Sequence, residues 1–249
     1  MNKLTSKTAL VTGGGSGIGR EIAKRLANDG AQVIIIGRGE TALLETAAMH
    51  ENITYLVADI VRSEDLENVV THIDSRFGKL DILVNNAGVA PNTPFESFTM
   101  DQYDAIFDVN VRGLIDVTRL ALPLLKKSRG VVINISSGVA HRPTPFIAIY
   151  SASKAAVSAL TKALEKELAP MGIRVNAVSA GATDTPLYEK NGLQSEEEKQ
   201  GFKDTVNQAI PLGLFARPEE IASAVAFLAS DDASYATGSD LVIDGGYSA

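Results

Sequence analysis

The sequence of 249 residues contains no cysteine and only three histidines, at positions 50, 72 and 141. A chain without cysteine has no disulfide framework, no thiolate metal ligand and no cysteine nucleophile. We therefore expect no bound metal, and a reduced cytosol is the simplest location. No window approaches the roughly 18 apolar residues of a membrane span, and Met1–Leu10 lacks the long apolar stretch of a secretion signal. These absences predict a cytoplasmic protein.

Runs of basic residues are also missing. Lys and Arg total 23 against 30 Asp and Glu, which gives a formal net charge of −7. A nucleic-acid backbone or an anionic membrane surface favours a basic protein face. The acidic balance therefore argues against nucleic acid or membrane as the main partner and leaves a small molecule as the expected one.

Apolar residues are plentiful, at 45% of the chain. This content and length are sufficient for one large core, so we expect a single domain over residues 1–249. Short β-branched runs alternate with segments of helical period. Such alternation predicts an α/β fold, with a parallel sheet of about seven strands covered by helices on both faces. The predicted strands are Thr8–Thr12, Gln32–Ile36, Ile53–Ala58, Asp81–Asn85, Val131–Ile135, Arg174–Val178 and Leu241–Ile243.

Several residues mark the ends of the predicted helices. Ser63, before two acids, is expected to be an N-cap, and Gly78 is expected to adopt a left-handed C-terminal conformation. Pro218 stands where a first helical residue is expected. The segment Tyr188–Gln208 is polar and rich in Glu and Lys. It is either a mobile substrate flap, covering about residues 186–210, or a solvated surface helix.

A glycine-rich turn follows the first predicted strand, in the sequence Gly13-Gly-Gly-Ser16-Gly17-Ile18-Gly19. Glycine allows unusual dihedrals and a close approach of the backbone to a pyrophosphate, which the N–H groups at the helix start then hold. The GxGxxG pattern fits no register here, whereas GxxxGxG fits. A P-loop is excluded because Arg20-Glu21 follows the last glycine. Ligand binding is favoured over a plain tight turn, which needs fewer glycines.

The residues after the second strand bear on the choice of cofactor. An acid there would select NAD through the ribose 2′-hydroxyl, whereas an arginine can pair with the 2′-phosphate of NADP. The chain has Gly37-Arg38 at this place. We therefore favour NADP(H), with NAD(H) as the alternative if Arg38 is only a solvated residue whose charge Glu40 partly offsets.

Tyr150 and Lys154 begin a strongly helical stretch and lie four residues apart, on one helix face. A free tyrosine has a pKa of about 10, and a nearby ammonium is expected to lower it. Hydride transfer to a ketone builds negative charge on oxygen, which needs an acid and a second donor. Ser137, at the end of the fifth strand, is the candidate second donor. The pair alone could be a surface contact; the serine and the glycine turn favour chemistry.

Four motifs in order resemble the short-chain dehydrogenase/reductase superfamily over essentially the whole chain. They are the turn from Thr12 to Gly19, Asn85-Asn86-Ala87-Gly88, Asn110 in Asn-Val-Arg-Gly, and Ser137 thirteen positions before Tyr150 with Lys154 four later. The chain is most similar to 3-oxoacyl-(acyl-carrier-protein) reductases and to bacterial ketoreductases and alcohol dehydrogenases. One departure is Ala180-Gly181 in place of the usual Pro-Gly, which is expected to loosen the turn into the flap.

This resemblance implies a single-domain Rossmann-type fold, doubly wound, and a role for each matched residue. Tyr150 would be the general acid/base, Lys154 would also bind the nicotinamide ribose, Ser137 would orient the carbonyl and Asn110 would support a water-linked proton relay. Asp59 and Ile60 would contact the adenine, Asn86 would pack against the adenosine ribose, and Thr183 and Thr185 would meet the nicotinamide carboxamide. The other expected cofactor contacts are Gly13, Ser16, Gly17, Ile18, Gly19, Arg38, Tyr150, Lys154 and Gly181. The resemblance also implies a homotetramer built on residues 101–127 and 151–169.

Competing functions remain open at this stage. A hydrolase could use Ser137 with His141, although the sequence lacks a GxSxG nucleophile elbow at Ser137. His141 could instead line the substrate pocket. A dinucleotide-binding regulator without catalysis, a dehydratase, or an NAD-linked dehydrogenase of a sugar, steroid or other alcohol would share much of the pattern. Substrate choice is expected in residues 90–95, residues 138–146 and the flap, where an apolar wall is indicated by Pro94, Phe95, Pro143, Pro145 and Phe146.

Overall fold

The computed structural model describes residues 3–186 and 195–249. Its centre is one parallel sheet with the strand order β3-β2-β1-β4-β5-β6-β7. Every predicted strand is present, and β5 and β6 each run two residues further than expected, to Ser137 and Ala180. The bounds are β1 Thr8–Thr12, β2 Gln32–Gly37, β3 Ile53–Val57, β4 Ile82–Asn85, β5 Val131–Ser137, β6 Arg174–Ala180 and β7 Asp240–Ile243. The predicted α/β class is confirmed.

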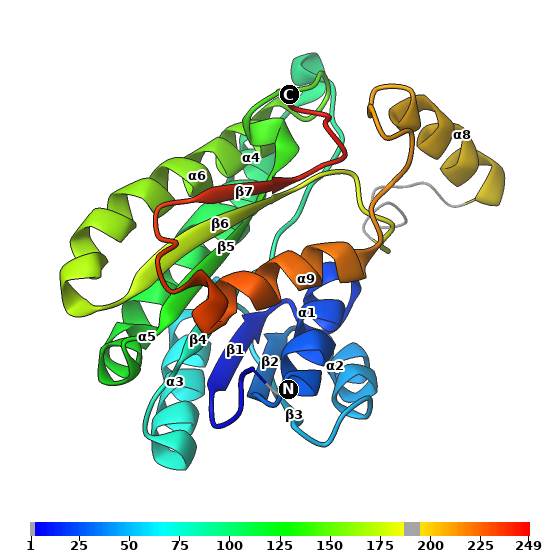
Figure 1. Cartoon of the computed structure of the whole chain (residues 1–249). Coiled ribbons are helices and arrows are strands. Elements are labelled where there is room, and N and C mark those ends of the chain that lie inside the picture. The colour runs from blue at the N-terminus through cyan, green and yellow to red at the C-terminus, as the bar shows by residue number, and fades with distance from the viewer. Residues whose placement is uncertain (1–2, 187–194) are drawn as a thin grey trace.

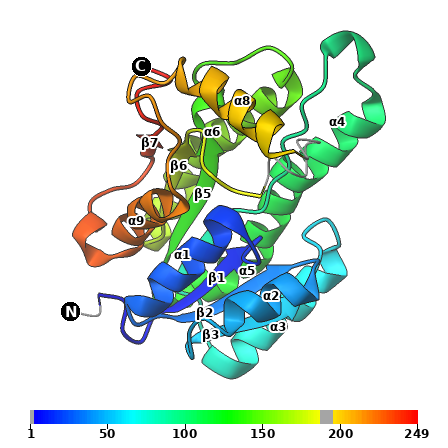
Figure 2. The same cartoon turned by 90° about the vertical axis from the view of Figure 1, so that its right-hand side faces the viewer.

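Helices cover both faces of this sheet (Figures 1 and 2). One face carries α1, α2 and α9, and the other carries α3, α5 and α6, while α8 stands away from the sheet. The bounds are α1 Gly17–Asn28, α2 Glu40–Ala47, α3 Ser63–Phe77, α4 Met100–Phe107, α5 Leu114–Ser128, α6 Ala148–Leu168, α8 Glu196–Asn207 and α9 Pro218–Ala229. Shorter helical turns are η1 Phe95–Ser97, η2 Asp108–Gly113, η3 Gly138–Ala140, η4 Ala169–Met171 and η5 Asp231–Ala233.

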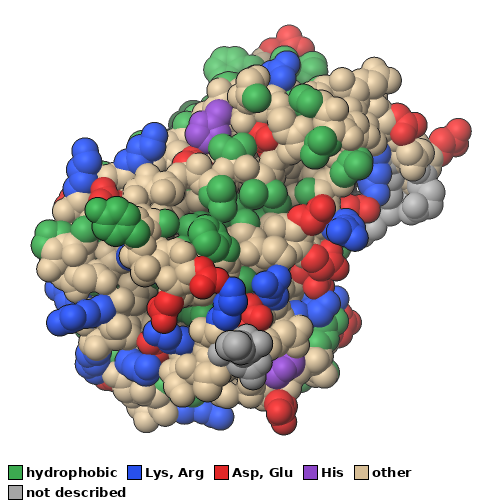
Figure 3. Space-filling view, viewed as in Figure 1, with side chains coloured by type: hydrophobic (Ala, Val, Ile, Leu, Met, Phe, Trp, Pro, Cys, Tyr) green, Lys and Arg blue, Asp and Glu red, His purple; other side chains and the backbone are tan. Residues whose placement is uncertain are grey.

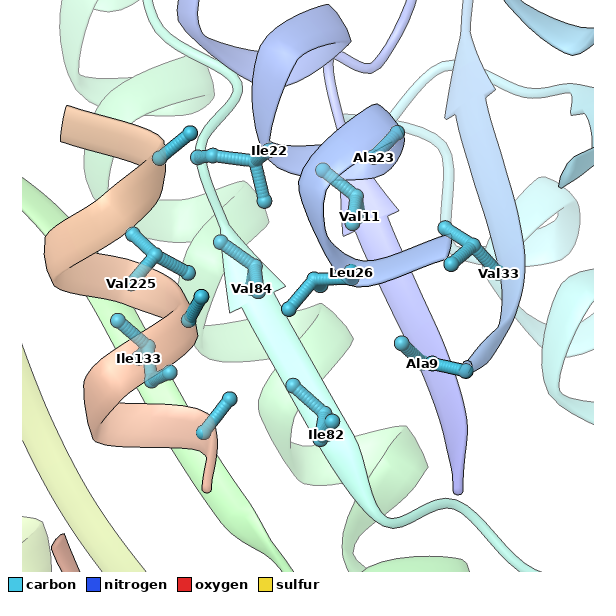
Figure 4. Packing of buried hydrophobic residues seen from close by; sticks show 14 of the residues in the cluster. Ala9, Val11, Ile22, Ala23, Leu26, Val33, Ile82, Val84, Ile133 and Val225 are labelled. Carbon is cyan, nitrogen blue, oxygen red and sulfur yellow. The ribbon is translucent and has the colours of Figure 1, made fainter. Parts of the chain in front are cut away.

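Two buried apolar layers explain why the strands are almost continuously hydrophobic. Successive side chains of a strand point to opposite faces. In β2, Val33 and Ile35 pack in the layer that includes α1 and α9, whereas Ile34 and Ile36 pack in the layer with α3 and α5. Figure 4 shows the first layer, in which Leu26 of α1 and Val225 of α9 lie over the strands. Each such side chain stabilises the fold by roughly 1.5–3 kcal/mol.

The helix ends test the cap and end residues predicted from the sequence. Gly78 ends α3 with a φ of 69°, and Pro218 is the first residue of α9, so both predictions are confirmed. The prediction for Ser63 is wrong. The N-cap of α3 is Arg62, and Ser63 is the first helical residue. Its hydroxyl donates instead to Asp116 Oδ2 on α5 at 2.6 Å, a charge-assisted hydrogen bond that links the two helices.

The carboxyl ends of neighbouring strands bring several of the predicted site residues together. The strand order reverses between β1 and β4, and in open α/β sheets ligands bind outside the carboxyl ends of strands at such a switch point. Gly13 follows β1, Asn86 follows β4 and Ser137 ends β5. These three neighbouring strands therefore place the glycine turn and the candidate catalytic serine side by side.

The surface carries charges of both signs. In the view of Figure 3, acidic and basic side chains are interspersed, and neither sign forms a continuous patch on this face. Across the described part of the chain, no helix is both long enough and apolar enough to cross a bilayer. Of the predicted flap, residues 187–194 lie outside the described residues, and the rest contains α8.

Candidate active site

The glycine turn is shaped by close backbone contacts. Gly13 and Gly17 have φ values of 66° and 53°, in the left-handed region that favours glycine. A Cβ atom on Gly19 would overlap the carbonyl oxygen of Gly13 and the amide of Asn86. Ser16, the N-cap of α1, makes no side-chain cap hydrogen bond, so the first N–H groups of the helix stay available to an anion. The turn therefore fits the pyrophosphate of a dinucleotide.

Asn86 fastens this turn to the end of β4. Its Nδ2 donates to the carbonyl oxygens of Thr12 at 2.9 Å and Gly13 at 3.2 Å, and its backbone N–H donates to Thr12 Oγ1 at 3.0 Å. The side-chain donors are thus used within the protein. Asn86 lies at the predicted place, and its observed contacts hold the phosphate turn in shape. Ile18, the second residue of α1, packs against the apolar layer below.

The residues predicted to meet the adenosine end lie after β2 and β3. Arg38 is exposed, and no hydrogen bond or ion pair joins its guanidinium to another residue in the described ranges. Asp59 Oδ1 accepts from the N–H of Val61 at 3.2 Å, which closes a turn after β3. Ile60 is buried against Gly113, where a Cβ atom would lie 2.8 Å from the isoleucine side chain. Arg38 is therefore free to bind an anion, while Asp59 and Ile60 form a fixed wall.

Ser137 and Tyr150 meet at the carboxyl end of β5. Ser137 is the last residue of that strand, and Tyr150 lies in the first turn of α6. The Ser137 side chain lies close enough to the Tyr150 hydroxyl to lower the pKa of Tyr150. Lys154, one turn further along α6, is buried, and its Nζ lies 5.9 Å from the centre of the Tyr150 ring. The helix face predicted from the spacing is confirmed, and two hydroxyls converge on one point.

The pKa of Tyr150 differs from the expectation. Burial raises it above its usual value, and the nearby Ser137 side chain offsets only part of this effect. The predicted lowering by Lys154 is not found. Burial lowers the pKa of Lys154 itself to about 8, which still leaves most of this lysine charged at neutral pH. The Nζ atom is directed to the main-chain carbonyl oxygen of Ile135, to which it donates at 2.8 Å. A raised pKa keeps the Tyr150 hydroxyl protonated at neutral pH.

Asn110 sits in a wide helical turn that the sequence did not reveal. It lies in η2, a π-helical segment between α4 and α5. Its Oδ1 accepts from Val89 N at 2.8 Å, and its Nδ2 donates to Val89 O and to Ser153 Oγ, both at 3.0 Å. Such π-turns interrupt helices mostly at functional sites. A Cβ atom on Gly88 would lie 3.2 Å from Asn110 Oδ1 and 3.5 Å from Lys154 Nζ, so both side chains approach the space that this glycine leaves open.

The segment after β6 crosses in front of the glycine turn. Thr185 approaches Gly17, where a Cβ atom would lie 3.2 Å from the threonine side chain. Thr183 is buried, and its hydroxyl donates to the carbonyl oxygen of Gly181 at 2.9 Å. Strand β6 continues through Ala180, which pairs with Ser137 and with Ile243. The segment predicted to contact the nicotinamide thus lies between the glycine turn and the candidate catalytic serine.

His141 lies away from the reactive hydroxyls. Its Nε2 is 3.2 Å from Ser179 Oγ and 3.1 Å from Asp240 Oδ2. No hydrogen bond joins its side chain to Ser137 in the described part of the chain, and Ser137 lies beside Tyr150 instead. A serine hydrolase needs its histidine on the nucleophile. The geometry therefore rejects the pairing of Ser137 with His141.

An apolar hollow lies beside Tyr150. Phe95 and Phe146, both predicted as pocket wall, contribute to it, whereas Pro94, Pro143 and Pro145 do not. The sequence analysis missed Phe98 and Ile106, since nothing in the linear pattern shows that the segment around α4 turns toward α6. The hollow is lined by Pro91, Thr93, Phe95, Phe98, Ile106, Phe146, Ile147, Ala148, Ile149 and Tyr150.

A doubly wound sheet, a glycine turn at its switch point and a Ser–Tyr–Lys group at the end of β5 define a dinucleotide-dependent oxidoreductase. Comparison with known proteins identifies the family. Residues 13–248 match the family described as enoyl-(acyl carrier protein) reductase, and the chain belongs to this branch of the short-chain dehydrogenases/reductases. It is thus an NAD(P)-dependent oxidoreductase.

Named relatives support this assignment. The 3-oxoacyl-(acyl-carrier-protein) reductase of Thermotoga maritima is 36% identical, over 98% of this chain and 98% of its own. The L-fucose dehydrogenase of Bos taurus is 38% identical, over 98% of this chain and 90% of its own. The crystal structure of the 3-ketoacyl-(acyl-carrier-protein) reductase from Brucella melitensis, complexed with NADH, superposes with a TM-score of 0.92 at 38% identity and covers 99% of this chain and 100% of that one.

Proposed function

We propose that the protein reduces a ketone to a secondary alcohol, and catalyses the reverse reaction, with Tyr150 as general acid/base. The placement of Tyr150 beside Ser137 at the carboxyl end of β5, with Lys154 anchored on the same strand, is the observation that carries this proposal. Two hydroxyl donors close to one position can stabilise a substrate carbonyl oxygen on which negative charge develops. When bound, the reduced nicotinamide supplies a hydride to the carbonyl carbon.

Side chains of the protein then supply the proton that the carbonyl oxygen needs. The Tyr150 hydroxyl, protonated at neutral pH, transfers its proton to the carbonyl oxygen, and Ser137 donates a hydrogen bond to the same oxygen. Lys154, with a pKa of about 8, is still largely cationic at pH 7 and stabilises the resulting phenolate. We also assign to Lys154 the binding of the nicotinamide ribose. Asn110, whose side chain approaches the same space beside Gly88 as Lys154, supports the return of a proton to Tyr150 through water.

Substitution of Tyr150 by phenylalanine tests this proposal. Tyr150→Phe removes the proton donor and keeps the ring that packs beside Lys154. We expect ketone reduction to fall by at least about 10³-fold, because general acid catalysis contributes about 10²–10⁴-fold. Cofactor affinity, measured by fluorescence of the reduced nicotinamide, should change by less than about twofold. Reduction rates within about tenfold of the wild type would refute the assigned role.

NADP(H) is the cofactor that we propose, with NAD(H) as the alternative. The free guanidinium of Arg38 after β2 supports a 2′-phosphate partner. The structure of the Brucella melitensis relative is a complex with NADH, which supports NAD(H) as the alternative cofactor. The proposed cofactor contacts are those predicted above, from Gly13, Ser16, Gly17, Ile18 and Gly19 through Arg38, Asp59, Ile60 and Asn86 to Tyr150, Lys154, Gly181, Thr183 and Thr185.

A sugar or another polar alcohol is the alternative substrate, since L-fucose dehydrogenase is among the relatives. The apolar lining of the hollow beside Tyr150 favours a substrate with an apolar group. Absorbance of the reduced nicotinamide, followed with aryl and alkyl ketones, a 3-oxoacyl thioester and aldohexoses, separates these classes. Binding of the cofactor without turnover of any substrate would instead favour a non-catalytic regulator.

We further propose a homotetramer and a substrate flap. Helix α6 presents a face of exposed small side chains, Ala152, Ala155, Ala159 and Ala163, which would let a second copy approach closely. This face lies within the predicted interface, residues 101–127 and 151–169. For the flap at residues 186–210, the ion pair between Lys203 of α8 and Asp184 at 2.9 Å links the described flap helix to the segment after β6.

A further inference from the structure

The loop of residues 138–147 joins the two reactive hydroxyls. It begins directly after Ser137 and ends where α6 begins, just before Tyr150. Its first half is held by its own backbone, because the N–H groups of His141 and Arg142 both donate to the carbonyl oxygen of Gly138 at 3.0 Å. This hydrogen bonding keeps the part of the loop next to Ser137 in place.

The second half of the loop has less backbone support. Pro143 and Pro145 have no N–H to donate. The carbonyl oxygen of Phe146 accepts from Thr93 N at 2.8 Å, and Phe146 itself has a φ of 68°. A bulky residue keeps this strained conformation only when its surroundings hold it there. The Phe146 ring forms part of the hollow beside Tyr150, so the support of this half affects the substrate wall.

The C-terminal segment approaches this loop through a rigid turn. After β7, Gly245 and Gly246 have φ values of 65° and 88°, which an L side chain rarely adopts. The carboxylate of Asp244 accepts from the N–H of Gly246 at 2.9 Å and from that of Ser248 at 3.0 Å. The turn therefore fixes the direction in which Tyr247 points.

Tyr247 touches the loop at three places. Its carbonyl oxygen accepts from Arg142 Nη1 at 2.7 Å, and the Arg142 guanidinium lies 5.1 Å from the centre of its ring. Its hydroxyl is hydrogen-bonded to the Thr144 hydroxyl and lies 3.4 Å from the carbonyl oxygen of Arg142. The approach is close, because a Cβ atom on Gly138 would lie 2.9 Å from Asp244 Oδ2 and 3.5 Å from the Tyr247 ring.

We propose that Tyr247 is a positioning residue that holds the loop of residues 138–147, and with it Phe146, in the conformation that binds the substrate. We call the contacts of Tyr247 with Arg142 and Thr144 the C-terminal clasp. The clasp acts on the loop between the hydroxyls and not on the hydroxyls themselves, so it governs substrate affinity more than the chemical step. This part of the inference depends on the function proposed above.

Hydrogen exchange tests the clasp without any need for activity. Tyr247→Phe and Thr144→Val each remove the bond between the two hydroxyls. We expect either change to speed amide exchange in residues 141–147 by up to about tenfold, the range of one hydrogen bond. Because the bond is shared, the double variant should exchange no faster than Tyr247→Phe alone. Tyr235→Phe is the matched control, since Tyr235 is fully exposed.

Steady-state kinetics test the effect on the substrate. In Tyr247→Phe and more strongly in Tyr247→Ala, we expect KM for the best ketone to rise by about five- to tenfold, with kcat and the Kd of the reduced cofactor within about twofold. A purely structural role would reduce the fraction of active enzyme and lower kcat with KM unchanged. Thr144→Val removes the other partner of the hydrogen bond between the Tyr247 and Thr144 hydroxyls. It should therefore also raise KM.

The outcomes separate the clasp from the proposed function. Unchanged exchange in residues 141–147, or independent and multiplying effects of the two single variants, would overturn the clasp. Faster exchange combined with an unchanged KM would overturn its role in substrate positioning. If the wild-type enzyme reduces no carbonyl compound, the function proposed above fails, while the exchange measurements still decide whether Tyr247 holds the loop.

Discussion

A Cβ atom on Gly19 would overlap the main-chain carbonyl oxygen of Gly13, six residues earlier in the same turn. The two glycines therefore fit together as a pair: Gly13 supplies the left-handed bend, with a φ of 66°, and Gly19 leaves room for the carbonyl group that the bend turns inward. The phosphate turn depends on this contact as much as on the freedom of its backbone.

Gly19→Ala should accordingly damage both stability and cofactor binding. Overpacking at a backbone contact costs about 1–3 kcal/mol, and the displaced turn loses its fit to a pyrophosphate. We expect a lower free energy of unfolding in urea and at least about a tenfold higher Kd for the reduced cofactor. Gly201→Ala in α8, where a Cβ atom meets nothing within 4 Å, is the control and should not destabilise the protein. Equal behaviour of the two variants would contradict the contact.

Arg38→Ala should weaken the binding of NADPH far more than the binding of NADH. The guanidinium can make charge-assisted hydrogen bonds only to the 2′-phosphate, which NADH lacks. Such bonds contribute about 1.5–3 kcal/mol, so we expect the Kd for NADPH to rise by about 10- to 100-fold and that for NADH by less than about twofold. Arg76→Ala, at the C-terminal end of α3, controls for the loss of one positive charge. A similar change in both affinities would remove the reason for naming NADP(H).

Lys154→Met should change how stability depends on pH. Burial lowers the pKa of Lys154 from 10.5 to about 8 in the folded protein. Between these values the unfolded chain binds more protons, so this lysine makes the wild type more stable as the pH rises and costs stability below pH 8. We expect the stability of the wild type relative to Lys154→Met to increase by about 2 kcal/mol between pH 7 and 9.5. Urea titrations at several pH values measure this difference, and a constant difference would argue against a buried, depressed Lys154.

Ala159→Arg should disrupt the proposed tetramer. A long cation in the middle of the exposed alanine face of α6 would keep two such faces apart and would be buried without a partner. Multi-angle light scattering should show the wild type as a tetramer and the variant as a smaller species. Ala48→Arg, at the exposed end of α2, adds the same charge elsewhere. A wild type that is monomeric at micromolar concentration would rule out the assembly.

Most of the fold was predictable because the strands in the middle of the sheet are buried on both faces. Apolar runs such as Gln32–Ile36 indicate a strand in the middle of a sheet, independently of the neighbouring segments. The glycines after β1 are needed for backbone dihedrals that are set within the turn itself. The helix pair of Tyr150 and Lys154 follows from spacing alone. In each case the cause lies within a few residues of sequence, which is why it could be inferred without the structure.

The features that were not predictable depend on contacts between distant segments. Ser63 is drawn to Asp116, 53 positions away, and not to its own helix start. Asn110 occupies a π-turn because Val89 and Ser153 both bind its side chain. The raised pKa of Tyr150 results from how deeply the surrounding chain buries it. A linear pattern contains none of these distances.

The acceptor that Lys154 uses, the carbonyl oxygen of Ile135, belongs to the main chain of the central strand β5. No side-chain replacement at position 135 can delete that oxygen. The anchoring of the Lys154 amine is therefore insensitive to loss of the side chain at its partner. Evolution, or a protein engineer, can accordingly exchange the loops that choose the substrate while the amine keeps its anchor.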